Sequence, residues 1–289
     1  MDNPENPMLK ELYPQAYRRY LALPLTSGVL RNRMRIVRNF CLYRQRTEPD
    51  CFVPDNHLFP TPHQPIKPYR FSEADIVGLL QTAATLKPSS RSPLRPVVFR
   101  LAVVLLYTTG MRRGELVRLT LGDYNPLRQT LSVRASKFHK SRDLPLSPDA
   151  DRELNAYFDA RRQRRLSMAL AAPLLWNGYG PGYTGSWLWQ GTRQLFRLAG
   201  VRTPEGRLPR THDMRHAFAV NALLRWYRAG IDVQTKLPLL ATYMGHVSIA
   251  STEYYLPFDE DLAAVASARF AACCGDMVAL LTNPIGGDQ

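Results

Sequence analysis

The clearest hydrophobic pattern in the chain lies between residues 72 and 110. Ser72 and Asp75 resemble a capping box in front of apolar residues at helical spacing, so we expect a helix to begin near residue 73. Residues 97–108 are mostly apolar and precede Gly110, a residue type that often ends helices. This second pattern predicts a helix that is buried on all sides.

Patterns farther along the chain predict more helices and one small sheet. TLSV at 130–133 and DLPL at 143–146 are short strand candidates, and the polar residues between them predict a hairpin. Three more helices are expected: one opens at Ser147-Pro148, one follows the Gly- and aromatic-rich stretch 171–191, and one runs from His212 to Ala229. The expected fold class is therefore mainly α (α+β), with a small antiparallel sheet.

Prolines mark a boundary in the first quarter of the chain. Pro60, Pro62, Pro65 and Pro68 disrupt both helix and strand patterns and favour an extended path. We therefore expect three parts, which are a short helical N-terminal region at 1–60, a linker at 61–70 and a large domain at 71–289. The end of the large domain, 257–289, is expected to form a tail, since much of it is apolar with a helical pattern.

The N-terminal region contains a basic helical segment. Residues 18–46 hold eight arginines and no acidic residue, interleaved with Met34, Val37, Phe40 and Cys41 at near-helical spacing. Such a segment could be a solvated helix face, but arginines without acidic partners favour contact with phosphates. The candidates for DNA contact in this helix are Arg31, Arg33, Arg35 and Arg38.

Two other groups of side chains have competing interpretations. The run Arg161, Arg162, Arg164 and Arg165, at the end of the helix that Ser147 opens, could follow a nucleic-acid backbone or form a solvated face. The aromatic residues of the Gly-rich stretch are expected to pack in the core, because the bases of a duplex are not exposed for stacking. These residues are Trp176, Tyr179, Tyr183, Trp187 and Trp189.

The charge of the chain points to a polyanionic partner. Lys and Arg number 38 against 24 Asp and Glu, a formal net charge of +14. Nucleic acid is the first candidate and an anionic membrane surface the second. The longest apolar run, residues 101–107, is far shorter than the roughly 20 residues that a spanning helix needs. We expect double-stranded DNA as the partner and no membrane-spanning helix.

Other features bear on the compartment and on metal binding. The N-terminal sequence MDNPENPMLKELYP lacks the basic start and apolar stretch of a signal peptide, so no export is expected. The four cysteines, at 41, 51, 273 and 274, have neither metal-ligand nor disulfide-framework spacing. We expect a cytoplasmic, nucleoid-associated protein with no metal ion and no cofactor.

Four short motifs carry residues suited to phosphodiester chemistry: TGMRRGEL at 109–116, THDMRH at 211–216, MGH at 244–246 and STEYY at 251–255. The guanidinium groups of Arg112 and Arg215 could bind the non-bridging oxygens of a phosphate. A tyrosine nucleophile, with a reference pKa of about 10, needs a proton acceptor, and His212 or His246 could provide it. A lysine on the hairpin, Lys137, could protonate the leaving hydroxyl.

These motifs, in this order, resemble those of the tyrosine recombinase (integrase) family, over roughly residues 70–260. The resemblance implies a tyrosine-recombinase catalytic domain preceded by a short helical DNA-binding region, which is shorter here than is usual in the family. It assigns catalysis to Arg112, Lys137, His212, Arg215, His246 and Tyr255, with Glu115 and His216 in support and Lys140 as a DNA contact. Tyr255 is preferred to Tyr254 because it lies nine residues after His246.

Each of these residues also has a structural interpretation. Arg112 or Arg113 could cap the helix that ends near Gly110, and Glu115 could orient an arginine. Lys137 could be a solvated hairpin charge, and Tyr255 a core aromatic residue. His212 could be a satisfied histidine of a first helical turn, His216 a packing residue and His246 a turn residue. Their joint occurrence favours the catalytic interpretation.

The resemblance implies that the tyrosine forms a 3′-phosphotyrosyl intermediate and releases a 5′-hydroxyl, and that four protomers act around two duplexes. The role is expected to be integration, excision or transposition of a mobile element. Three alternatives are a type IB topoisomerase-like enzyme, a noncatalytic DNA-binding module and a basic ribonuclease or RNA-binding protein. The topoisomerase would relax supercoils as a monomer, the module would be indifferent to Tyr255→Phe, and the third would prefer RNA.

Overall fold

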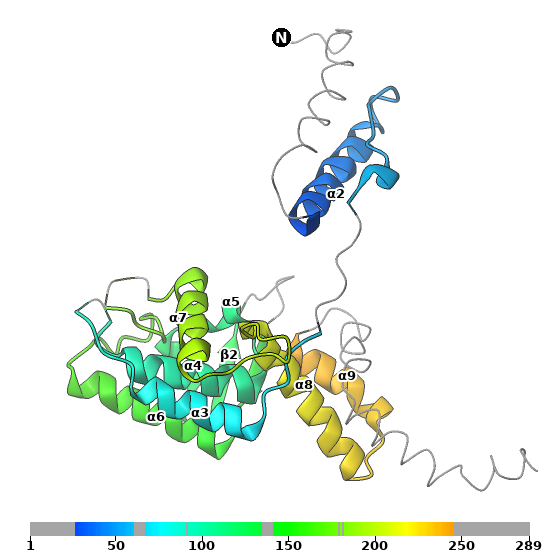
Figure 1. Cartoon of the computed structure of the whole chain (residues 1–289). Coiled ribbons are helices and arrows are strands. Elements are labelled where there is room, and N and C mark those ends of the chain that lie inside the picture. Colours follow the sequence, from blue (N-terminus) through cyan, green and yellow to red (C-terminus); the bar gives the residue numbers. More distant parts are fainter. Residues whose placement is uncertain are drawn as a thin grey trace, which may run out of the picture. The chain divides into compact units, whose positions relative to one another are not determined.

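The chain divides into two compact units, Met1–Lys67 and Pro68–Gln289, and the division falls within the proline-rich stretch (Figure 1). The computed structural model describes residues 27–60, 67–90, 92–134, 141–178, 180 and 182–245. Within these ranges, no helix is both long enough and apolar enough to cross a membrane.

The smaller unit is built on helix α2 (Ser27–Arg44), followed by a loop with a short 3-10 turn, η1 (Asn56–Leu58). Leu30 and Met34 are buried, and the partly buried rings of Phe52 and Phe59 pack against them. The predicted apolar face is therefore only partly correct. Met34 belongs to it, but the side chains of Val37 and Phe40 are exposed, because the loop covers the α2 face that carries residues 30 and 34.

The larger unit is mainly helical, as predicted. Its described helices are α3 (Glu73–Ala84), α4 (Arg95–Thr109), α5 (Arg113–Leu116), α6 (Pro148–Gln163), α7 (Gly185–Leu198), α8 (Thr211–Arg228) and α9 (Val233–Met244). Helix α4 packs against α3, α6 and α8 (Figure 1). This arrangement explains why α4 has apolar residues on every side, and it confirms the prediction of a buried helix.

The sheet is small and antiparallel, with strand order β1-β2-β3. Its strands are β1 (Tyr124–Asn125), β2 (Thr130–Val133) and β3 (Arg142–Pro145). Leu131 lies opposite Leu144, and both side chains are fully buried. The sequence predicted β2 correctly, placed β3 one residue too late and missed the short β1.

Local capping signals determine where several helices begin and end. Ser72 Oγ accepts from the Asp75 backbone N–H at 3.1 Å, and the Asp75 carboxylate accepts from the Ser72 N–H at 2.8 Å, which is the predicted capping box. Ser147 Oγ caps α6 by accepting from the Ala150 N–H, without a reciprocal bond from the alanine. Gly110 ends α4 in a left-handed conformation, with a φ of 60°.

The structure corrects two predictions about side-chain environment. Neither interpretation of the arginine run fits Arg161, which is fully buried and donates to the carbonyl oxygens of Ser167 at 2.6 Å and Pro173 at 3.0 Å. This guanidinium supports the loop after α6. Core packing is correct for Tyr183 but wrong for Trp187 and Trp189, which are 62% and 38% exposed on α7.

Candidate active site

Arg112 is placed by a sharp turn between two helices. Helix α4 ends at Gly110, and α5 begins at Arg113, so Arg112 occupies the position just before α5. A side chain at Gly110 would be strained by the positive φ, and its Cβ would lie 2.4 Å from the ring of Phe218 on α8. The glycine therefore lets the turn approach α8 closely.

Glu115 orients Arg112 from one helical turn away. Its carboxylate accepts from the Arg112 backbone N–H at 2.8 Å and from Arg112 Nη1 at 2.9 Å. Burial opposes ionisation of this carboxyl group, but hydrogen bonds from Arg142 and Arg112 lower its pKa to about 2. Glu115 is therefore ionised at neutral pH although its side chain is almost fully buried.

Arg215 approaches the same place from α8. Its side chain is buried, with Nη1 donating to the Gly110 carbonyl at 2.6 Å and Nη2 donating to the Met244 carbonyl at 2.7 Å. Arg112 also reaches the end of α9, where Nη2 donates to the Gly245 carbonyl at 2.8 Å. Arg112 thus donates to Glu115 and to the end of α9, and the interpretation of Arg112 as a cap of α4 is wrong.

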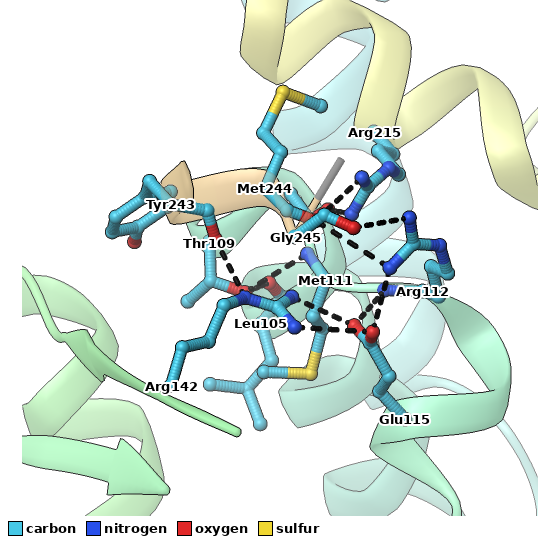
Figure 2. Close-up of polar contacts among 11 residues, drawn as sticks. Leu105, Thr109, Met111, Arg112, Glu115, Arg142, Arg215, Tyr243, Met244 and Gly245 are labelled. Atoms are coloured by element: carbon cyan, nitrogen blue, oxygen red, sulfur yellow. Dashed lines mark hydrogen bonds and ion pairs between the residues drawn. The ribbon is translucent and has the colours of Figure 1, made fainter. Parts of the chain in front are cut away.

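The C-terminal end of α9 is the point at which these side chains converge (Figure 2). Helical carbonyl groups in a last turn have no partner within the helix and carry partial negative charge. Here the carbonyl oxygens of Tyr243, Met244 and Gly245 accept hydrogen bonds from arginine side chains. The fold therefore gathers positive charge at this helix end, next in sequence to His246.

His212 lies in the first turn of α8, three residues before Arg215, so the two share a helix face. His212 itself is exposed to solvent. Partial desolvation, and then the positive charge of Arg215, lower the pKa of His212 below its usual 6.5. At neutral pH the imidazole is therefore uncharged, and one ring nitrogen can accept a proton.

His216 lies one turn after His212 on the same helix, and it is buried. This position suits the packing or supporting role that the sequence allowed. The remaining predicted residues lie outside the described ranges: Lys137, Lys140, His246, Tyr254 and Tyr255. Of the predicted catalytic set, the structure therefore shows Arg112, His212 and Arg215, and it brings both arginines to the end of α9.

Arg142 also belongs to this cluster, although the sequence did not lead us to predict it. Its Nη1 and Nη2 donate to the two carboxylate oxygens of Glu115 at 3.1 and 2.8 Å, and its Nε donates to the Tyr243 carbonyl at 2.6 Å. The signal was the period of two along β3, since Arg142 and the fully buried Leu144 lie on one face of the strand. Because residues 134–142 contain several other basic residues, Arg142 did not stand out among them.

The four candidate DNA contacts in the smaller unit fall into two pairs. Arg31 Nη1 donates to the Pro60 carbonyl at 2.6 Å, and Arg38 Nη1 donates to the Pro54 carbonyl at 2.5 Å, so both side chains hold the loop on α2. Arg33 and Arg35 are exposed. Their guanidinium groups are more accessible to a phosphate backbone than those of the first pair.

Metal binding is not suggested by this arrangement. In the part of the chain that the structure describes, no three His, Cys, Asp or Glu side chains are grouped so as to hold a metal ion. The charged groups nearest the end of α9 are guanidinium groups and one carboxylate, a set suited to an anion.

Comparison with known proteins connects this cluster to a family. Residues 70–260 match the model described as "Phage integrase family". A Sinorhizobium fredii protein named as an integrase/recombinase, y4rB, is 34% identical over 232 residues, which cover 80% of this chain and 74% of that protein. The tyrosine recombinase XerA of Pyrococcus furiosus is 28% identical over 199 residues, which cover 65% of this chain and 57% of that protein.

Solved structures share the fold at lower sequence identity. The crystal structure of XerA recombinase matches 93% of this chain and 85% of its own, with a TM-score of 0.55 and 22% identity. The Tn1549 transposon integrase in complex with transposon right end DNA matches 88% of this chain and 83% of its own, with a TM-score of 0.61 and 19% identity. At such identities the likeness concerns the fold.

Proposed function

This chain belongs to the phage integrase family of tyrosine recombinases, site-specific recombination enzymes, and on that premise we propose that it integrates, excises or transposes a mobile element. The reaction would cut and rejoin DNA strands through a 3′-phosphotyrosyl intermediate. The name of its Sinorhizobium fredii relative supports a mobile-element role.

One observation carries the proposal. Arg112 and Arg215 are 103 positions apart in the sequence, yet both donate to backbone carbonyls at the end of α9 (Figure 2). Each guanidinium has five N–H donors, so bonds to carbonyl groups can hold it in place while other donors meet a phosphate. Oriented guanidinium groups at one position are the arrangement that stabilises the charge of a phosphoryl transition state.

The chemistry that we propose requires no external energy source. The Tyr255 oxygen attacks the scissile phosphorus as its hydroxyl proton passes to His212 or His246, the P–O5′ bond breaks, and the leaving 5′-oxygen takes a proton from Lys137. Arg112 and Arg215 donate to the non-bridging oxygens, and the lowered pKa of His212 leaves its imidazole neutral and able to accept that proton. A 5′-hydroxyl from the second strand then attacks the phosphotyrosine and restores a phosphodiester, so the bond energy is conserved.

The proposed partner is double-stranded DNA, bound by four protomers around two duplexes. The exposed Arg33 and Arg35 of the smaller unit would add contacts to the phosphate backbone, and Arg31 and Arg38, the other two predicted contacts, would support them by holding the loop on α2. The formal net charge of +14 supports such contacts.

A covalent-adduct assay tests the reaction. Full-length protein is incubated with a labelled duplex that carries the recombination site, taken from the DNA that flanks the gene, and a nick near the cleavage position. Denaturing electrophoresis then detects covalent protein–DNA product. We expect an adduct with the wild-type protein and with Tyr254→Phe, and none with Tyr255→Phe.

Other results would contradict the proposal in different ways. Salt-sensitive DNA binding without any adduct would favour a noncatalytic DNA-binding module. An adduct combined with relaxation of supercoiled plasmid by monomers, without preference for a sequence, would favour the topoisomerase-like alternative. An adduct that survives Tyr255→Phe and disappears with Tyr254→Phe would place the nucleophile one residue earlier.

A further inference from the structure

Arg142 connects three segments of the larger unit. It begins β3, it shares the two carboxylate oxygens of Glu115 with Arg112, and it donates to the Tyr243 carbonyl in the last turn of α9. Its side chain is only 9% exposed, and that of Glu115 is 1% exposed. The contacts join the sheet to the two elements that hold Arg112.

We propose that Arg142 is a positioning residue of the recombination reaction, which fixes Glu115 and the end of α9 and thereby sets the orientation in which Arg112 meets the scissile phosphate. This inference rests on the proposed function. Arg142 itself need not touch DNA, because its guanidinium nitrogens donate to Glu115 and to the Tyr243 backbone.

Arg142 gives Glu115 a second partner from another element. Arg112 donates one hydrogen bond to each carboxylate oxygen, from its backbone N–H to Oε2 and from Nη1 to Oε1. The planar fork of Arg142 donates a second bond to each oxygen from β3, so the plane of the carboxylate is held by two residues. That plane in turn determines where the Arg112 guanidinium lies.

The end of α9 adds a second constraint on the same guanidinium. Gly245 ends the helix with a φ of 66°, and a Cβ at this position would lie 2.9 Å from Arg142 Nη1 and 3.4 Å from Arg112 Nη1. Both arginines therefore pack directly against this glycine. Because Arg142 also holds the Tyr243 carbonyl, it limits movement of the residues to which Arg112 donates.

A lysine substitution separates positioning from charge. Arg142→Lys keeps the positive charge but cannot bridge both oxygens of Glu115 and the Tyr243 carbonyl. With full-length protein and the nicked duplex, we expect the single-turnover rate of adduct formation at saturating DNA to fall at least tenfold. The Kd for DNA should stay within twofold, because Arg142 acts on Arg112 rather than on DNA.

The matched control is Arg100→Lys. Arg100 also contacts both oxygens of a carboxylate, that of Glu153, through Nε at 2.8 Å and through Nη2, but it joins α4 to α6. The Arg100→Lys variant should form adduct at the wild-type rate. Thermal melting of each variant reports whether it is folded. Arg142→Gln, which keeps a hydrogen-bond donor, is measured as a second variant, and its rate of adduct formation should fall at least as far as that of Arg142→Lys.

A double-mutant cycle tests the route through Glu115. If Arg142 acts by holding this carboxylate, then Arg142→Lys combined with Glu115→Gln should be no slower than the slower single variant. If the fold-losses in rate of the two single variants instead multiply in the double variant, Arg142 does not act through Glu115. An unchanged rate in Arg142→Lys, or a loss explained entirely by weaker DNA binding, would overturn the inference alone, whereas the absence of any wild-type adduct would overturn the proposed function and this inference with it.

Discussion

At the scale of single residues, the contacts of Glu115 explain most about how the site is held together. The sequence indicated a residue that orients an arginine, and the structure shows this contact together with a second one to Arg142 that no motif suggested. The contact with Arg112 is local, three residues away on one helical turn, and could be anticipated. The contact with Arg142 joins residues 27 positions apart and depends on how the sheet packs against α5.

The lowered pKa of Glu115 predicts a pH-dependent contribution to stability. The ionised carboxylate stabilises the folded protein above about pH 4.5, and this contribution is lost as the pH falls towards the folded-state pKa of about 2. Glu115→Gln lacks it. Its deficit in melting temperature relative to the wild type should be constant above pH 5 and should shrink between pH 4.5 and 2. A deficit that does not change with pH would contradict the account.

At the scale of elements, the sequence predicted helices better than it predicted their surroundings. Capping residues and the apolar pattern are local, so the first residues of α3, α4, α6 and α8 were placed within about two residues. The burial of a side chain depends on what packs over it, which local patterns do not encode, and the predictions for Trp187 and Arg161 were wrong. The convergence of Arg112 and Arg215 was expected only through the family resemblance, because no periodicity relates α5 to α8.

The turn between α4 and α5 yields a test of packing at this scale. Gly110→Ala would place a methyl group in a left-handed conformation and against the ring of Phe218, so we expect a loss of about 1–3 kcal/mol in unfolding free energy. Gly78→Ala is the control. Gly78 lies inside α3 with nothing within 4 Å of an added Cβ, and its replacement should stabilise by up to about 1 kcal/mol.

Urea unfolding followed by circular dichroism measures both changes. Equal midpoints for Gly110→Ala and the wild type would contradict the close approach of the turn to α8. Destabilisation by Gly78→Ala would contradict the open environment of that position in α3.

At the scale of the whole molecule, the arginines of the two compact units have different contacts. The larger unit carries the convergent arginines, and the smaller unit carries arginines of two kinds. Arg31 and Arg38 stabilise the loop on α2, whereas Arg33 and Arg35 are exposed. The sequence alone could not separate these pairs, because all four share one basic helix and differ only in what covers them.

Salt dependence distinguishes the two pairs of arginines. Each lost phosphate contact should reduce the slope of log K against log salt concentration by about one, so Arg33→Ala/Arg35→Ala should reduce it by about two without changing the melting temperature. Arg31→Ala/Arg38→Ala should lower the melting temperature instead, because the loop loses both carbonyl contacts. Unchanged slopes in the first double variant would exclude these residues from the DNA contact.

The central claim is that Arg112, held by Glu115 and the end of α9, neutralises the charge of the scissile phosphate. The most direct test compares Arg112→Ala with the wild-type protein on two nicked duplexes, one with an ordinary scissile phosphate and one with an uncharged methylphosphonate there. We predict that the variant loses about 10²–10³-fold in the rate of adduct formation on the phosphate and less than tenfold on the methylphosphonate. Equal losses on both duplexes would contradict the claim.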